Sequence, residues 1–360
     1  MIDLAPNEEQ SLVVETVRAF AEKEIRPRAR EWDEAFALDP AILQQAHELG
    51  LVANALPEEV GGGGAWSAVT GALVAEELAW GDLSAALAIL SPALEALPVA
   101  EFGSEEQRRQ WLPAFAGPSF VAGALAVVEP GVRRSAFEPA TRARAEGRDF
   151  VLRGRKCAVP WLASGQSCLV SASTDEGPAL FRVPRDAPGL AATPERYMGL
   201  QALPLAALEL DGVRVPAASR IGGSGSLRRL LARGRVALAG CAVGVARASY
   251  EIAREYAKER HAFGAPIATK QAIAFKLADM ATAIDGLRLL VWEAAWRLDQ
   301  GDDALREATL AIDRARVISL EVTDGAVQVL GGHGYTREYL PEMHLRNARG
   351  FAVLEALALV

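Results

Sequence analysis

One carboxylate, Glu355, stands in an apolar segment, because the last ten residues of the sequence read FAVLEALALV. Apolar surroundings raise the pKa of a carboxylic acid, and a carboxylate tuned in this way can serve as a general base. The same pattern is also that of a leftover carboxylate in a frayed terminal helix. Arg235, in LARGRVALAG, offers a cation that either binds an anionic group or lies in solvent near a helix start. The sequence leaves both pairs of alternatives open.

Other common chemistries lack their motifs. The chain has no G-x-S-x-G nucleophile turn, no G-x-x-x-x-G-K-[ST] loop and no Glu-x-x-His pair, and its glycine-rich PEEVGGGGA and IGGSGS do not complete G-x-G-x-x-G. Four histidines without ligand spacing are expected at surfaces or helix ends: His47, His261, His333 and His344. Three cysteines without C-x-x-C spacing are expected to be buried thiols: Cys157, Cys168 and Cys241. We therefore predict no metal site and no hydrolysis by a serine nucleophile.

Net charge and hydropathy further narrow the class of protein. The 360 residues carry a net charge of -8, which opposes nucleic-acid binding, although a few local arginines would suffice for a small anionic ligand. No run of eighteen apolar residues indicates a membrane span, and the opening MIDLAPNEEQ has no secretory pattern. We expect a cytoplasmic protein without a membrane partner.

The elements that must position these residues fall into three blocks. The sequence reads as helical up to about residue 115, as short β-prone pieces between residues 120 and 216, and as helical again from residue 227. We predict a mostly α, α+β fold with an N-terminal helical domain at 1–117, a central β-sandwich or small barrel at 118–222, and a helical domain at 223–360. Blocks in this order disfavour a Rossmann fold.

Two long segments carry a resemblance to the acyl-CoA dehydrogenase family. YAKERHAFGAPIATKQAIAFKLADM, residues 256–280, is similar to the family motif Y-A-x-x-R-x-x-F-G-x-P-I-x-x-x-Q followed by L-A-D-M. AVQVLGGHGYTREYLPEMHLRNAR, residues 326–349, resembles its A-x-Q-x-x-G-G-x-G-Y-x-x-E-Y run and its closing R-D-A-R. The resemblance spans the chain and implies a C-terminal four-helix bundle, FAD as cofactor and an acyl-CoA as substrate.

The resemblance also assigns roles. It implies a reaction in which a carboxylate removes the α-proton of the acyl-CoA while the β-hydrogen leaves as hydride to the flavin. The positions it matches to the ADP portion of FAD, in a neighbouring subunit, are Arg260, Phe263, Gln271, Gln328, Gly331 and Gly332. Arg235 matches a position near CoA, and Glu355 matches the usual base. Gly234 stands where some relatives carry an alternative catalytic Glu.

The chain departs from the family where the flavin ring would lie. The family's T-E-P-x-A-G-S-D reads VEPGVRRS at residues 128–135, and K-x-W-I-T reads KCAVP at 156–160. The expected hydroxyls and tryptophan are absent, and proline has no N–H to donate. The E-G-T-x-Q that follows the base is also missing.

The retained ADP positions and the lost ring positions lead to one hypothesis. The chain is a subunit of an α2β2 acyl-CoA dehydrogenase and lends ADP contacts to a homologous partner, resembling actinobacterial enzymes that act on CoA thioesters of steroid side chains. An electron-transfer flavoprotein is the expected acceptor. The alternatives are a self-sufficient homotetramer with Glu355 as base, and a scaffold subunit that binds no FAD.

Overall fold

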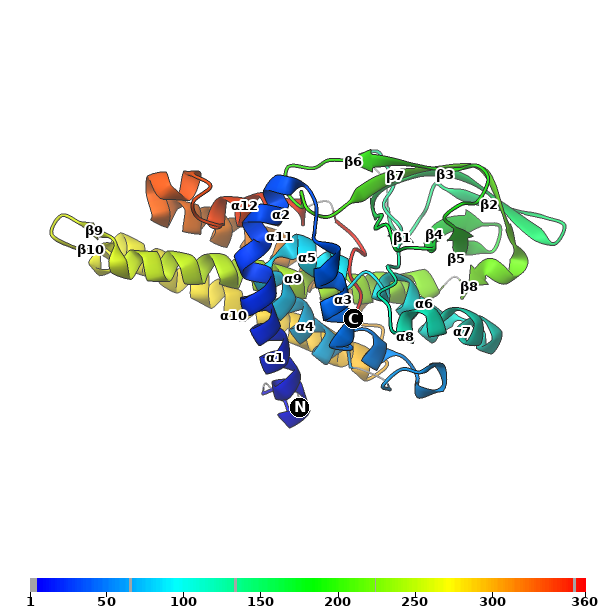
Figure 1. Cartoon of the computed structure of the whole chain (residues 1–360), viewed down its shortest axis with the longest axis horizontal. Helices are drawn as coiled ribbons and strands as arrows, with labels where there is room; N and C mark the ends of the chain where they lie inside the picture. Colours follow the sequence, from blue (N-terminus) through cyan, green and yellow to red (C-terminus); the bar gives the residue numbers. More distant parts are fainter. Residues whose placement is uncertain (1–4, 65–66, 133–134, 224, 352–353) are drawn as a thin grey trace.

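The computed structural model describes residues 5–64, 67–132, 135–223, 225–351 and 354–360. Within them, helices occupy the first part of the chain, strands run from Leu125 to Ile221, and long helices follow from Ser226. Figure 1 shows the sheet at one end of an elongated molecule and the helical bundle extending away from it. The helix–strand–helix order predicted from the sequence is confirmed.

The N-terminal helices form one side of the core. Their bounds are α1 Glu8–Phe20, α2 Ala29–Ala35, α3 Pro40–Glu48, α4 Ala68–Gly81, α5 Leu83–Ile89, α6 Ala93–Phe102, α7 Glu105–Trp111 and α8 Pro113–Ala116. Polar caps set their starts: the Asn7 side chain accepts from the Gln10 amide at 2.8 Å, and the Asp82 side chain accepts from the Ala85 amide at 2.8 Å between α4 and α5. The helices α4 and α5 are buried on nearly all sides, as core helices are.

The strands form one mixed sheet in the order β6-β7-β3-β2-β4-β5-β8, with β1 beside β4. Their bounds are β1 Leu125–Ala126, β2 Arg142–Glu146, β3 Asp149–Pro160, β4 Ser167–Thr174, β5 Gly177–Pro184, β6 Leu190–Glu195, β7 Leu205–Pro216 and β8 Arg220–Ile221. The strands β2 and β4 pair only at Arg142 and Ser173. Across the sheet, the ring of Phe150 on β3 lies 4.9 Å from the ring of Phe181 on β5. The sheet therefore encloses its own small core.

The C-terminal helices are α9 Ser226–Glu259, α10 Gln271–Asp299, α11 Leu305–Leu330 and the short α12 Pro341–Gly350; the hairpin of β9 His261–Ala262 and β10 Ala265–Pro266 joins α9 to α10. Two glycines of α9 let it pack tightly against α4. A Cβ on Gly240 would lie 3.0 Å from the Ala72 carbonyl oxygen, and one on Gly244 would lie 2.1 Å from that of Glu76. The glycine and alanine spacing of this segment did predict close helix packing.

Helix α9 is the one helix of the described residues that is, by itself, long and apolar enough to cross a membrane, but 78% of its most apolar window is buried inside the fold. That burial is typical of a core helix. His344 corrects another expectation, because it lies inside α12 with only 3% of its surface exposed and with Nδ1 3.3 Å from the Ser249 Oγ. Burial, with Arg26 and Arg30 nearby, lowers its pKa to about 3. Cys168 and Cys241 are buried as expected, whereas Cys157 is only half-buried.

Candidate active site

Glu355 and Arg235 form an ion pair at the centre of the molecule. One guanidinium nitrogen of Arg235, Nη2, lies 2.8 Å from the Glu355 Oε1, and Nε lies 3.3 Å from both carboxylate oxygens. The two side chains are only 11% and 15% exposed. A planar guanidinium facing a carboxylate in this way is a strong and directional contact. The two residues that the sequence singled out, 120 positions apart, are thus brought together.

The backbone explains how the last segment reaches α9. A Cβ on Gly234 would lie 3.0 Å from the Ala356 Cα, so glycine allows the segment to approach the helix closely. Ala356 takes a left-handed φ of 51°, which costs less for a glycine. Residues 356–360 are buried and non-helical. The expectation of a frayed terminal helix is therefore wrong.

The predicted apolar surroundings of Glu355 are also wrong. Its neighbours Leu354 and Leu357 turn into the hydrophobic core, but the carboxylate itself faces Arg235, and Arg316 lies 3.6 Å from Oε1. The segment after Glu355 is irregular, with Ala356 at a left-handed φ, so the sequence neighbours of Glu355 do not report the surroundings of its carboxylate. Glu355 is a paired carboxylate.

Two partners of Arg235 carried no signal in the sequence. The Thr309 hydroxyl on α11 accepts a hydrogen bond of 2.7 Å from Nη1. The ring of Phe137, from the segment before β2, lies 5.1 Å from the centre of the guanidinium. Phe137 therefore joins the sheet domain to the bundle at this site. These contacts depend on chain segments about 70 to 100 residues away.

A buried ion pair fixes the two sheet segments where a flavin ring was expected to lie. Lys156 is fully buried, and its Nζ lies 2.9 Å from the Glu129 Oε1 and 3.0 Å from the Ser171 Oγ. Glu129 also accepts from the amide and hydroxyl of Thr141 at 2.8 and 2.6 Å. Burial raises the pKa of Glu129, but the Lys156 charge and the Thr141 hydrogen bonds have a larger combined effect and lower this pKa to about 2. Burial lowers the pKa of Lys156 to about 8 despite Glu129.

Beyond this pair, the segment offers few donors to a ring system. The Cys157 amide donates to the Val128 carbonyl at 2.9 Å, and the Ala158 amide donates to the Glu195 carboxylate at 2.7 Å. Pro160 has no N–H, as the sequence indicated. The substituted Arg133 and Arg134 lie outside the described residues. At these three positions the described segment therefore offers no free backbone donor to the isoalloxazine ring of FAD.

The residues matched to the ADP portion of FAD gather at the far end of the bundle. Arg260 follows the end of α9, Phe263 lies in the β9–β10 hairpin and Gln271 begins α10. Gln328, Gly331 and Gly332 lie where α11 ends. The two groups are joined by aromatic contacts, since the Tyr256 ring lies 6.1 Å from that of His333. Figure 1 shows this end opposite the sheet.

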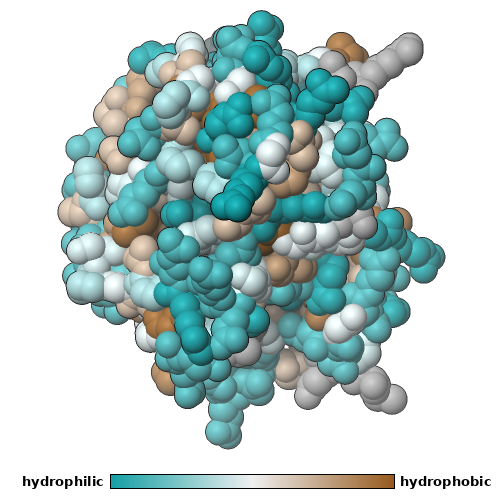
Figure 2. All heavy atoms as spheres, turned by 90° about the vertical axis from the view of Figure 1, so that its right-hand side faces the viewer, coloured by the Kyte–Doolittle hydropathy of each residue, from teal (hydrophilic) through white to brown (hydrophobic). Residues whose placement is uncertain are grey.

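These side chains are free to meet another molecule. Among the described residues, nothing forms a hydrogen bond or ion pair with the side chains of Arg260, Gln271 or Gln328, and Phe263 is 98% exposed. Figure 2 shows that the surface at the opposite, sheet end is mainly hydrophilic with scattered apolar residues. Arg260 lies 25 residues after Arg235 along α9, or about 37 Å at 1.5 Å per residue.

Comparisons with known proteins identify the class. Two family models match: the acyl-CoA dehydrogenase N-terminal domain over residues 7–118 and the acyl-CoA dehydrogenase C-terminal domain over residues 222–355. The chain belongs to the acyl-CoA dehydrogenase family of oxidoreductases.

Among its relatives is the mitochondrial short-chain specific acyl-CoA dehydrogenase of Bos taurus, which is 36% identical over 353 residues that cover 95% of this chain and 85% of the relative. The fold is similar to a chain from the structure of the electron transferring flavoprotein of Acidaminococcus fermentans, at 30% identity and a TM-score of 0.91 over 99% and 96% of the two chains. It is also similar to a glutaryl-CoA dehydrogenase from Mycobacterium smegmatis in complex with FADH2, at 27% identity and a TM-score of 0.89 over 98% and 92%. FAD, expected from the sequence motifs, is thus the cofactor of relatives.

Proposed function

We propose that this chain is a subunit of an FAD-dependent acyl-CoA dehydrogenase that works as an α2β2 heteromer with a homologous chain. Its bundle end binds the ADP portion of the partner's FAD, while the partner supplies the flavin ring site and the base. The observation that carries the proposal is the division of the site. The ADP-type residues are exposed and unpaired, whereas in the ring-type segment the amides of Cys157 and Ala158 are engaged and Pro160 has none.

The bundle end has the chemistry that a diphosphate requires. The free guanidinium of Arg260 can donate two parallel hydrogen bonds to phosphate oxygens. Gln271 and Gln328 can bond sugar or phosphate groups, and Phe263 can pack on the cofactor. A Cβ on Gly332 would meet nothing within 4 Å in this chain, and its φ is not left-handed. A glycine there is unexplained by the chain itself and suits the close approach of a ligand.

The exposed apolar residues of α10 support an oligomer. Phe275, which is 61% exposed, lies 12 residues after the 98% exposed Phe263, and Leu289, which is 45% exposed, lies further along this helix. Large exposed apolar side chains on one element are typical of protein interfaces. A second family member covering α10 would bury them and bring its FAD to Arg260. The loss of ring-binding donors in this chain favours an unlike partner.

The substrate follows from the family. We propose α,β-dehydrogenation of an acyl-CoA to a 2-enoyl-CoA, in which bound FAD supplies the hydride acceptor. A short-chain acyl-CoA, as named for the Bos taurus relative, and a CoA thioester of a steroid side chain are the two substrates to compare first. In the self-sufficient alternative described next, Arg235 would be the cation that meets the CoA. An electron-transfer flavoprotein is the proposed electron acceptor, in keeping with the likeness to the Acidaminococcus chain.

One observation favours a second candidate, the self-sufficient homotetramer. Glu355 lies largely buried beside Arg235, and the sequence resemblance matches it to the family's usual base. Glu355→Gln separates the two candidates. If the chain works in the heteromer, this variant leaves the turnover of the complex within about threefold of that of the native complex. If the chain is a self-sufficient enzyme, the variant lacks its base and its turnover falls by at least about 100-fold. A scaffold that binds no FAD is disfavoured by the unpaired Arg260.

The test is co-expression of this chain with homologous chains encoded near it, followed by native mass measurement. The proposal predicts an α2β2 assembly whose FAD affinity falls at least about tenfold on Arg260→Ala. Arg306→Ala is the matched control, since this side chain is 84% exposed and lies elsewhere on the bundle. Equal FAD affinity for both variants would refute the ADP-binding role.

A further inference from the structure

The helix α9 holds the buried segment 356–360 with three consecutive residues, Arg233, Gly234 and Arg235. Arg235 bonds the carboxylate just before the segment, and the segment begins against Gly234. At the other end, Nη1 of Arg233 donates to the main-chain oxygen of Val360 at 2.7 Å. Because an α-helix turns by about 100° per residue, the two arginines point to opposite sides of α9. The segment therefore crosses the helix with one arginine at each end.

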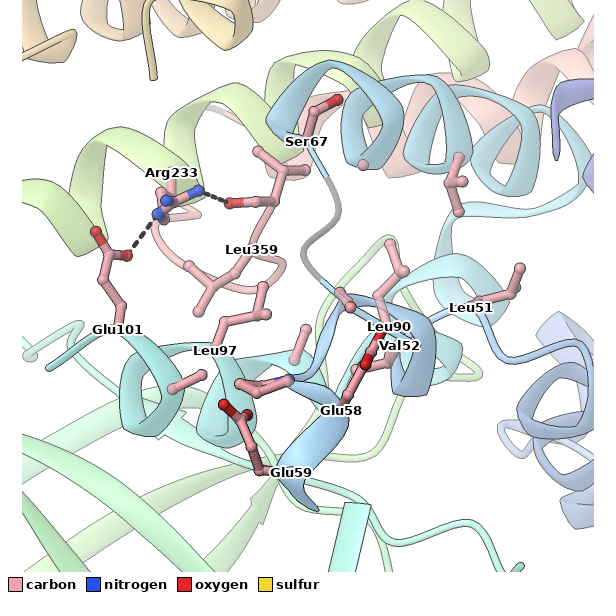
Figure 3. Close-up of a pocket in the computed structure, with 18 residues that line it drawn as sticks. Leu51, Val52, Glu58, Glu59, Ser67, Leu90, Leu97, Glu101, Arg233 and Leu359 are labelled. Atoms are coloured by element: carbon pink, nitrogen blue, oxygen red, sulfur yellow. Dashed lines mark hydrogen bonds and ion pairs between the residues drawn. The ribbon is translucent and has the colours of Figure 1, made fainter. Parts of the chain in front are cut away.

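On the Arg233 side of α9, the segment forms part of the wall of a cavity of about 540 Å³. Leu359 and Val360 line this cavity together with residues of α4 and α6, and most of the lining is apolar. The volume is within the range of small-molecule sites, roughly 300–1,000 Å³. Figure 3 shows Leu359 beside Arg233 on one side of the cavity and Leu51 on the other. Such a space suits an uncharged apolar group.

The same stretch of chain connects the cavity to the candidate active site. Glu355, which the sequence resemblance matches to the base, directly precedes the segment whose residues Leu359 and Val360 line the cavity. An acyl-CoA bound beside this carboxylate needs an apolar space for its acyl chain, and the cavity is such a space. We therefore take the cavity as the place of the acyl chain.

Arg233 fixes the position of this wall. Its Nε donates to the Glu101 carboxylate of α6 at 2.6 Å, and Figure 3 shows this bond and the one to the main chain. Arg229, one turn earlier on α9, lies 2.9 Å from the other oxygen of Glu101. Among the described residues, the bond from Arg233 to Val360 is the one hydrogen bond that the main chain of 356–360 makes. Hydrogen bonds from a charged donor are stronger than neutral ones.

We propose that Arg233 sets the length of the acyl chain that this cavity accepts, acting through Val360. With the guanidinium in place, Leu359 and Val360 stay against the cavity and limit the space open to the chain. Without it, the segment loses its main-chain hydrogen bond, and the space lengthens. The inference rests on the proposed function, because it takes an acyl-CoA as the ligand. Arg233 is a positioning residue and takes no part in the chemistry.

Binding of CoA thioethers measures this selection without turnover, because a thioether has no acyl group to dehydrogenate. A series from butyl-CoA to hexadecyl-CoA, each below its micelle-forming concentration, is titrated by calorimetry into the protein purified with its partner. Binding by the partner is the same for every variant, so differences between variants report this chain. Each methylene that becomes buried raises affinity about fourfold, so two more give at least about tenfold. Arg233→Met is therefore expected to raise the hexadecyl-to-butyl affinity ratio at least about tenfold.

Three variants control for a general loss of stability. Arg229→Met removes the other partner of Glu101, at a side chain 44% exposed, and should leave the ratio within about threefold of the native value. Arg233→Lys keeps a cation that can donate to the Val360 oxygen and should restore most of the native ratio. Leu359→Ala shortens the wall directly and should raise the ratio even if Arg233→Met does not fold. Equal ratios in the native protein and in both wall variants would overturn the inference.

The native mass and the FAD-to-protein ratio of the same samples test the proposed function separately, because neither involves Arg233. An α2β2 complex with two FAD and one length profile for all variants would keep the proposed function and refute the role of Arg233. An affinity that does not depend on alkyl length would refute that role as well. A shifted profile in a complex without FAD would support the role of Arg233 and contradict the proposed function.

Discussion

The ion pair between Glu129 and Lys156 gives the sharpest prediction of stability. Glu129→Gln leaves a fully buried ammonium without its counter-ion, with the Ser171 hydroxyl at 3.0 Å and the Val127 carbonyl at 3.5 Å still near. Removing one partner of a buried pair costs about 3–5 kcal/mol of unfolding free energy. The matched control is Glu146→Gln, whose carboxylate is 47% exposed and bonds Arg214 at 2.8 Å. Exposed pairs contribute about 0–1 kcal/mol, so the control should change little.

Urea unfolding followed by circular dichroism measures this difference. The penalty of Glu129→Gln should be smaller at pH 9 than at pH 7, because Lys156, with its pKa lowered to about 8, loses its charge there and no longer needs a partner. In the native chain, the pKa of Glu129 is lowered from 4.5 to about 2, so its contribution of about 3 kcal/mol is present above pH 4.5 and lost as pH falls toward 2. A penalty equal to that of Glu146→Gln would refute this reasoning.

Three further predictions concern the packing and the bundle end. Gly244→Ala should destabilise the chain by about 3 kcal/mol or more, because its Cβ would lie 2.1 Å from the Glu76 carbonyl oxygen. The control Gly286→Ala, whose Cβ would meet nothing within 4 Å, should stabilise the chain by about 1 kcal/mol. Thermal unfolding of the two variants checks both values. The pKa of His344 is lowered from 6.5 to about 3, so the fold should lose up to about 5 kcal/mol as pH falls through this window, and a His344→Gln variant should lack that loss; a pH series of urea midpoints would contradict this if the two proteins ran parallel. Phe263→Ala should leave the melting temperature of the chain within about 1 °C, because a side chain that is 98% exposed packs on nothing in this chain, yet it should lower retention of FAD by the assembled pair on dilution.

The sequence predicted the three-part fold well because its motifs and periodicity are local. Helical spacing and the glycines of α9 directly report which faces pack, as Gly240 and Gly244 confirm. Arg260, Phe263 and Gln271 lie within a dozen residues, so their gathering at one end of the bundle followed from the motif alone. Their roles stay predictions until FAD binding is measured.

The surroundings of Glu355 could not be predicted in the same way. Its apolar sequence neighbours pack into the core, while the partners of its carboxylate come from α9 and α11. The ring of Phe137 beside Arg235 and the burial of His344 also depend on contacts between distant segments. Such contacts are set by tertiary packing, which periodicity and composition do not encode residue by residue.

The most direct test of the central claim is the FAD-to-protein ratio of this chain purified alone and together with its homologous partner. The proposal predicts a colourless chain on its own and two FAD per α2β2 assembly for the pair. One FAD bound per chain by this protein alone would contradict the proposal and would make Glu355 the base of a self-sufficient acyl-CoA dehydrogenase.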